Sequence, residues 1–303
     1  MSNNPASGTI AFRKTYCIEA TYPFPILRQT FQSNPAVVKR LLLEKFTDGQ
    51  PLPRTLRCWR MLTEKPWQPD LVLRLMLGIF ASISLGTIIV QGLAPKGTDS
   101  PGGGINLATF MIGTLTFHGV ALVLVNVFLR QHQISWTEAF GFRATGLARA
   151  LLFAWIVTLV VLPIALSLGQ LSAKLLTMFH QPVKLQQAVE SLQSAAFLSQ
   201  RIYFGVAAIV VAPFVEEVIF RGILYPAIKQ RGYPRFALWG TSIFFAVTHA
   251  NLMTLLPLTF LALILTLLYE TTNNLLAPIA THSFFNAANF FWLLYQMQHQ
   301  IAG

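Results

Sequence analysis

The sequence predicts an all-α protein, a polytopic bundle of transmembrane helices with about seven to eight spans and a basic N-terminal region. Three observations predict this fold. Hydrophobic residues make up 54% of the 303 residues, charged residues make up only 11%, and the apolar residues gather in long runs. A soluble domain carries about 25% charged residues. The composition also excludes a disordered chain, and two cysteines exclude a disulfide scaffold.

Seven apolar runs are candidates for membrane-spanning helices, because a span requires about 20 mostly apolar residues. The runs cover residues 75–94, 107–129, 150–171, 202–220, 236–250, 253–269 and 276–295. Pro163 predicts a kink inside the third run. The fifth run is short, and an eighth, re-entrant segment is compatible with the pattern.

The chain divides into three predicted parts. Residues 1–70 form a polar, basic cytoplasmic region. Within it, the apolar residues between 37 and 46 recur at helical spacing beside Lys and Arg. They predict an amphipathic helix that either lies on lipid headgroups or packs inside a small domain. Residues 71–200 hold the first three spans, their loops and a surface helix at 185–196. Residues 201–303 hold the remaining spans, which form the catalytic core if the polar motifs described below carry chemistry.

The Lys and Arg residues lie mostly in the N-terminal region and in the loops between apolar runs, and they do not gather on one face of a domain. The net charge is +11, and 11 of the 22 Lys and Arg residues lie in residues 1–74. The later loops alternate between few and several positive residues. Because cytoplasmic loops carry more Lys and Arg, this alternation predicts that the N-terminus lies in the cytoplasm. The same basic residues can then contact anionic lipid. No signal peptide is apparent. We therefore expect an integral protein of the plasma (inner) membrane that does not bind nucleic acid, since no basic face is interleaved with stacking aromatics.

The fourth run contains two adjacent carboxylates. Ionisable residues inside spans are costly and usually functional. Glu217 and Arg221 are four residues apart on one helix face and can pair, which leaves Glu216 pointing elsewhere as a candidate general base. The alternative interpretation is a buried ion pair that braces two helices, or a helix end that reaches the interface.

Two later runs carry the other unexpected polar residues. His249 closes the fifth run, with Phe245 one turn earlier and able to pack on the imidazole. His282 and Asn286 are four residues apart in the last run, where they place a proton carrier or metal ligand beside an amide suited to an oxyanion. Each is also explained by an interface histidine or an interhelical polar contact. If they converge with Glu216 on one cavity, they can activate water against an amide.

The three ordered motifs resemble those of the CPBP family, the CAAX-protease and bacteriocin-processing (Abi) intramembrane endopeptidases: Glu216-Glu217-x-x-x-Arg221, Phe245-x-x-x-His249 and His282-x-x-x-Asn286. The resemblance covers roughly residues 200–295. It implies a hydrolase, an endopeptidase that cleaves a peptide or protein substrate at or near the membrane. Prenylated CAAX substrates are implied only by the family's eukaryotic branch.

The resemblance also implies a role for each residue. Glu216 is implied as the base that activates water, with His249 beside it. His282 and Asn286 are implied to stabilise the tetrahedral oxyanion. The residues implied to support the site are Glu217, Arg221 and Phe245.

The resemblance leaves the cofactor open, because the family includes both metalloproteases and metal-independent glutamate proteases. Glu216, His249 and His282 form an acceptable zinc set of one carboxylate and two imidazoles. Their spacing is not H-E-x-x-H. Each of the three residues lies on a different predicted helix, so no two ligands are already held together by one helix. We favour a glutamate mechanism without a cofactor, with zinc as the alternative.

The residues exclude three other classes of intramembrane protease, and they leave two functions outside the protease class as alternatives. No Asp lies in an apolar run, which excludes an aspartyl intramembrane protease, and H-E-x-x-H is absent, which excludes a site-2 zinc protease. Gly240-Thr-Ser242 lacks the second Gly of a rhomboid-type turn. A proton-coupled transporter with helices broken at Pro213, Pro257 or Pro278 stays an alternative. So does a non-catalytic immunity protein that binds a peptide.

Overall fold

The computed structural model describes residues 62, 64–93, 107–142, 147–195 and 197–301. All regular structure among these residues is helical, so the predicted all-α bundle is confirmed. The chain divides into two compact units, Met1–Trp59 and Arg60–Gly303. The amphipathic helix predicted between residues 37 and 46 lies outside the described residues. The predicted boundaries at residues 70 and 200 stay predictions.

The first half of the bundle holds three long helical stretches and two short helices. The second stretch is continuous through a π-helical segment, η2, and the third is 32 residues long with Pro163 inside it. In chain order the elements are α3 (Pro69–Leu93), α4 (Leu107–Thr114), η2 (Leu115–Gly119), α5 (Val120–Gln131), α6 (Trp136–Phe140), α7 (Leu147–Met178) and α8 (Gln187–Gln193).

The second half begins with one continuous helical stretch that changes between α and π geometry. π-Helical turns are rare and occur frequently at functional sites. After this stretch the chain forms three more α-helices. In chain order the elements are α9 (Leu198–Val206), η3 (Ala207–Val211), α10 (Ala212–Glu217), η4 (Val218–Leu224), α11 (Tyr225–Lys229), α12 (Pro234–Val247), α13 (Leu255–Thr272) and α14 (Leu276–Ile301).

Five helical stretches among the described residues are long and apolar enough to cross a membrane: Pro69–Gly92, Phe110–Gln131, Leu147–Met178, Leu198–Lys229 and Leu255–Thr272. The other two predicted runs are also helical. However, α12 has only 14 residues, and the His and Asn residues of α14 lower its hydropathy. The polytopic bundle is therefore confirmed, and five of the seven predicted runs meet these length and hydropathy criteria in the described part of the chain.

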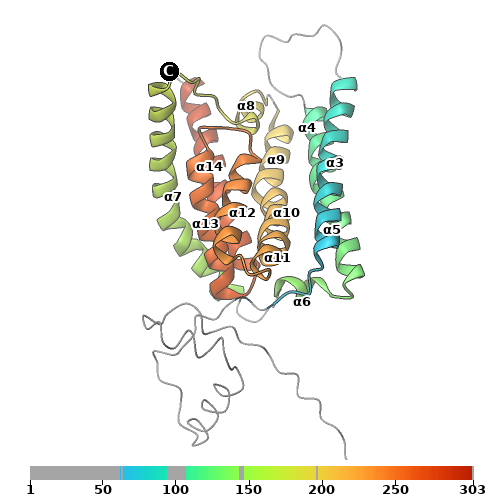
Figure 1. Cartoon of the computed structure of the whole chain (residues 1–303). Coiled ribbons are helices and arrows are strands. Elements are labelled where there is room, and N and C mark those ends of the chain that lie inside the picture. The colour runs from blue at the N-terminus through green and yellow to red at the C-terminus, as the bar shows by residue number, and fades with distance from the viewer. Residues whose placement is uncertain (1–61, 63, 94–106, 143–146, 196, 302–303) are drawn as a thin grey trace, which may run out of the picture. The chain divides into compact units, whose positions relative to one another are not determined.

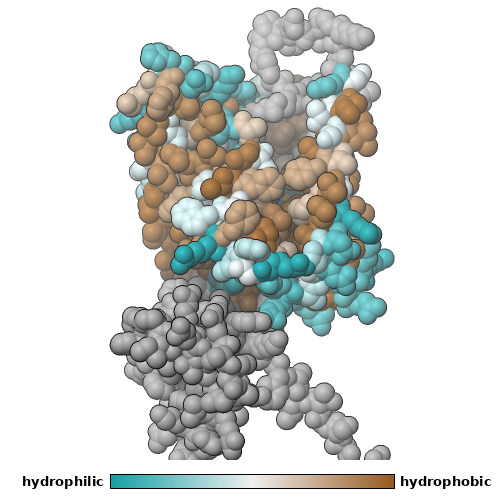
Figure 2. All heavy atoms as spheres, in the orientation of Figure 1, coloured by the Kyte–Doolittle hydropathy of each residue, from teal (hydrophilic) through white to brown (hydrophobic). Residues whose placement is uncertain are grey.

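The stretch Leu198–Lys229 lies at the centre of the packing and is the most buried of the five. Its η3 and α10 pack on α14, and its η4 contacts α12 and α13, while α7 packs on α13 and α14 (Figure 1). Figure 2 shows hydrophobic residues through the middle of one face and hydrophilic residues toward both ends. Leu152, Leu159 and Val160 of α7 are each more than half exposed, as expected for side chains that face lipid.

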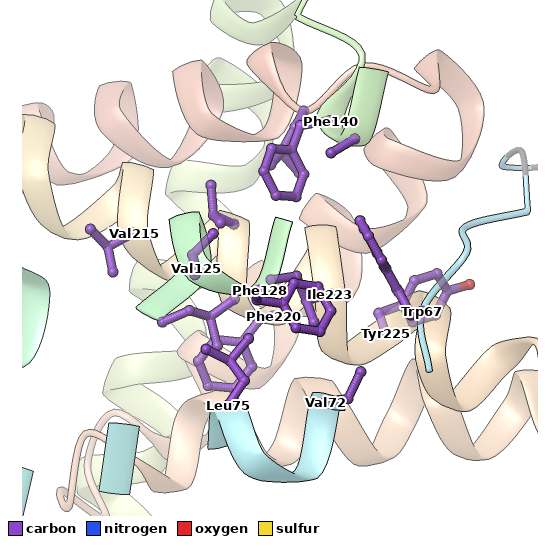
Figure 3. Packing of buried hydrophobic residues seen from close by; sticks show 14 of the residues in the cluster. Trp67, Val72, Leu75, Val125, Phe128, Phe140, Val215, Phe220, Ile223 and Tyr225 are labelled. Atoms are coloured by element: carbon purple, nitrogen blue, oxygen red, sulfur yellow. The ribbon is translucent and has the colours of Figure 1, made fainter. Parts of the chain in front are cut away.

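A hydrophobic cluster joins the first spans to the central stretch. It includes Leu75 of α3, Val125 of α5, Val215 of α10 and Phe220 of η4 (Figure 3). Gly222 allows a close approach here, because a Cβ at this position would lie 2.6 Å from the ring of Phe140 on α6. The central stretch is therefore held on this side by packing against α3, α5 and α6.

The segment before α3 also contacts the central stretch. The indole of Trp67 donates to the carbonyl of Gly222 at 3.0 Å. Pro226 has no N–H, so this carbonyl lacks its usual donor four residues later, and the indole replaces it. The Glu270 carboxylate accepts hydrogen bonds from the Leu62 amide and the Tyr225 hydroxyl, at 3.2 and 2.6 Å. These contacts connect the start of the bundle to the end of the helix that carries the carboxylate pair.

Candidate active site

The buried member of the carboxylate pair, Glu217, is the centre of a polar network. Its side chain is 0% exposed, and its Oε1 accepts a hydrogen bond from Arg221 Nη1 at 2.8 Å. The predicted pairing of these two residues is therefore present, although η4 begins between them. The Glu217 Oε1 is also 2.9 Å from Nδ1 of His282 on α14. One carboxylate oxygen thus connects the central stretch to the last helix.

His282 lies between the two carboxylates. Because Glu217 pairs with Arg221 and acts as an acceptor, Nδ1 of His282 carries the hydrogen that they share. Its Nε2 then faces Glu216, at 3.8 Å from Oε2. This separation is too long for a hydrogen bond but close enough for attraction if the imidazole is protonated. Glu217 therefore orients His282 toward Glu216, which the sequence did not predict.

Glu216 is the more accessible of the two carboxylates. Its side chain is 15% exposed, whereas the side chain of Glu217 is fully buried. Among the described residues, no side chain or backbone group donates a hydrogen bond to Glu216 within normal geometry. A carboxylate that is partly accessible and has no donor of its own can accept a proton from water. This position fits the general base predicted from the sequence.

Phe245 packs against most of the other site residues. It is 0% exposed, and its ring centre lies 5.0 Å from that of His249 and 5.7 Å from that of His282. The guanidinium carbon of Arg221 lies 4.6 Å from the same ring centre, within the range of a cation–π contact. The predicted packing of Phe245 on His249 is present, and the same ring also orders the buried network.

His249 joins the group through Phe245 rather than through a direct polar contact. Its Nδ1 lies 2.9 Å from the carbonyl oxygen of Phe245, to which it donates, and the residue is partly exposed at the end of α12. No hydrogen bond or ion pair links His249 to Glu216 or His282 in the part of the chain that the structure describes. The Nε2 of His249 is left for another partner.

Asn286 has a structural contact that restricts its chemistry. Its Nδ2 donates to the carbonyl of Ala208 in η3 at 2.8 Å. In the i to i−5 pattern of η3, the donor for this carbonyl would be residue 213, which is Pro213 and has no N–H. Asn286 satisfies the acceptor that the proline leaves unpaired. An amide has two hydrogens, so one remains for a substrate oxygen.

The described residues include no group of three or more His, Cys, Asp or Glu side chains placed to hold a metal ion. The alternative zinc set of Glu216, His249 and His282 therefore does not fit a metal as these side chains lie, because zinc needs its ligands within about 2.0–2.2 Å at once.

Sequence reasoning left out one polar side chain, His118 of η2. It is one of only three histidines in or beside an apolar run. Both of its ring nitrogens are buried without a hydrogen-bond partner.

The family match covers the part of the chain that holds these residues. Residues 198–288 match the family described as Type II CAAX prenyl endopeptidase Rce1-like, which confirms the resemblance seen in the three motifs over these residues. A curated protein of Bacillus subtilis (strain 168), "Putative membrane peptidase YdiL", is 34% identical over 77 residues, or 25% of this chain. The match spans only about a third (32%) of the length of that relative. No solved structure matches the chain.

Proposed function

Because residues 198–288 match the Rce1-like type II CAAX prenyl endopeptidases, we propose that this protein is an intramembrane endopeptidase of the glutamate type. Its substrate is a peptide or protein that reaches the site at or near the membrane surface. One observation carries the proposal: a partly exposed Glu216 stands beside a histidine that the buried Glu217 and Arg221 hold in place. This arrangement gives one carboxylate a fixed neighbour and leaves it free to act on water.

In the proposed reaction, Glu216 accepts a proton from water, and the water oxygen attacks the carbonyl carbon of the scissile peptide. The proton then passes to the leaving amide nitrogen as the C–N bond breaks. His282 can share this proton, because its Nε2 faces Glu216. The remaining hydrogen of Asn286 is the candidate donor to the oxyanion, and the Nε2 of His249 is a further candidate contact for the water or the substrate.

The test uses purified wild-type protein in lipid nanodiscs with two internally quenched peptides of one sequence. One peptide carries a farnesylated cysteine four residues from its C-terminus, and the other has the same cysteine without the lipid. Glu216→Gln keeps the size of the side chain and removes the base, so we expect kcat to fall by about 10²–10⁴-fold. The matched control is Glu190→Gln, an exposed carboxylate on α8, which should stay within about twofold of wild type.

The proposal fails if the wild type cuts neither peptide, or if Glu216→Gln cuts at the wild-type rate. Cleavage of the farnesylated peptide alone would assign a prenylated substrate, whereas equal cleavage of both would assign unmodified peptides. We also propose that the N-terminus is cytoplasmic, which the distribution of Lys and Arg supports.

A further inference from the structure

The short segment that precedes α3, residues 64–68, makes polar contacts with several parts of the bundle, and we call it the strap. The Lys65 ammonium donates to the carbonyl of Ala139 on α6 at 2.7 Å. The backbone amide of Gln68 donates to Nε2 of His132, just after α5, at 3.0 Å. Because the strap has no regular structure of its own, such contacts with the helices fix its path.

A further contact of the strap reaches the central stretch. Trp67 is only 7% exposed, and its indole donates to the carbonyl of Gly222 in η4 at 3.0 Å. Its ring packs on those of Phe128 and His132, with ring centres 5.1 and 5.3 Å away. This packing restricts rotation of the indole, so the donor stays directed at η4.

The helix α6 holds the same residue of η4 from a second direction. A Cβ at Gly222 would lie 2.6 Å from the ring of Phe140, so this ring rests directly against the backbone. The residue before Phe140 is Ala139, whose carbonyl accepts the hydrogen bond from Lys65. The strap and α6 are therefore joined to each other, and together they hold one residue of the π-helical turn.

The residue held in this way directly follows Arg221, which supports the candidate site. Arg221 donates to Glu217 at 2.8 Å, and the same oxygen of Glu217 is 2.9 Å from Nδ1 of His282. A displacement of about 1 Å in a supporting group can cost a reaction on the order of 100-fold. The position of the Gly222 backbone thus reaches the imidazole beside the proposed base through Arg221 and two hydrogen bonds.

We propose that Trp67 is a positioning residue for the proposed reaction. It fixes the part of η4 that follows Arg221, and so the geometry in which Arg221 and Glu217 hold His282. The inference rests on the proposed peptidase function and deepens it. The strap lies outside residues 198–288, which match the Rce1-like family, so a segment beyond that match then contributes to the reaction.

The kinetic test uses Trp67→Phe, which keeps an aromatic ring and removes the donor, on whichever quenched peptide the wild type cleaves. The matched control is Trp136→Phe on α6. It also loses an indole hydrogen bond, at 3.3 Å, but to Asn126 on α5 rather than to the central stretch. Well below the melting temperature of each protein, Trp67→Phe should lower kcat by about 10-fold or more with KM within about twofold. The control should stay within about twofold of wild type in both constants.

A second measurement needs no substrate. Hydrogen–deuterium exchange of each protein in nanodiscs compares the amides of η4 with those of α7, which the strap does not hold. Loss of one buried hydrogen bond should speed exchange over residues 218–229 by about 5- to 30-fold in Trp67→Phe. Exchange in α7 should stay at the wild-type rate, and Trp136→Phe should leave η4 unchanged.

Wild-type kcat in Trp67→Phe would overturn the inference, and so would unchanged exchange in η4. Equal losses of kcat in the two Trp variants, or faster exchange spread evenly over η4 and α7, would also overturn it, since these results indicate a general loss of stability. If the wild type cleaves neither peptide, the proposed function fails, while the exchange rates still decide whether Trp67 holds η4.

Discussion

Arg221 makes three contacts that a shorter side chain would lose together. It is 2% exposed, donates from Nη1 to Glu217 at 2.8 Å and from Nη2 to the carbonyl of Ala262 at 3.1 Å, and lies over the ring of Phe245. Replacing it with Met keeps a long apolar chain but removes the charge. The buried carboxylate of Glu217 then keeps only His282 as a partner. We therefore predict that Arg221→Met lowers stability strongly.

The magnitude follows from the burial of both partners. Removing one member of a buried ion pair costs about 3–5 kcal/mol, since it leaves the other charge uncompensated. The lost hydrogen bond to Ala262 belongs to the same network, so its cost is not simply added. A value of about 4 kcal/mol, at roughly 2–4 °C per kcal/mol for a protein of this size, lowers the apparent melting temperature by about 8–16 °C.

The assay measures the melting temperature of wild type, Arg221→Met, Glu217→Gln and the double variant in one detergent. Gln at position 217 still accepts from Nδ1 of His282 but carries no charge. The double variant should therefore be more stable than Arg221→Met alone, because no uncompensated charge remains. The reasoning is refuted if Arg221→Met melts within about 2 °C of wild type, or if the double variant recovers nothing.

Three further predictions concern the start of the bundle and its orientation. Trp67→Phe removes the donor to the Gly222 carbonyl and should cost about 1–2 kcal/mol, measured as a fall of roughly 2–8 °C in melting temperature; an unchanged value would contradict the contact. Burial lowers the pKa of Lys65 from 10.5 to about 8, so the folded state binds fewer protons than the unfolded state between these values. Stability should therefore rise with pH across this window, and Lys65→Met should remove that rise; an identical slope in both proteins would contradict it. In intact cells, a membrane-impermeant maleimide should label Cys17 and Cys58 only after permeabilisation, and labelling beforehand would place the N-terminus outside.

The sequence located the helices of the bundle better than their ends. The fourth apolar run was predicted at residues 202–220, but the helical stretch extends over Leu198–Lys229. The predicted run ended at residue 220, because the charged Arg221 lowers the hydropathy of the segment that follows. In the fold this residue is neutralised by Glu217 one turn earlier, so the helix continues through it. Charge that is paired inside the bundle is invisible to a count of apolar residues.

Local spacing predicted the contacts that one helix makes with itself. Glu217 with Arg221 and Phe245 with His249 are both four residues apart, and the structure forms both contacts. His282 and Asn286 are also four residues apart, and both side chains bond to the stretch Leu198–Lys229. Their partners were not predictable, because Asn286 bonds to a carbonyl of η3. That acceptor depends on a π-helical turn before a proline, which spacing alone does not reveal.

The sequence by itself determined that the chain is a helical membrane protein and which few ionisable residues interrupt its spans. It did so because an apolar run and a four-residue spacing are properties of one helix. Only the tertiary structure decided that Glu217 holds His282 beside Glu216, and that Phe245 packs against both His249 and His282. These relations depend on how separate helices rotate and pack against each other. Many distant side chains set that packing together, and no local pattern records it.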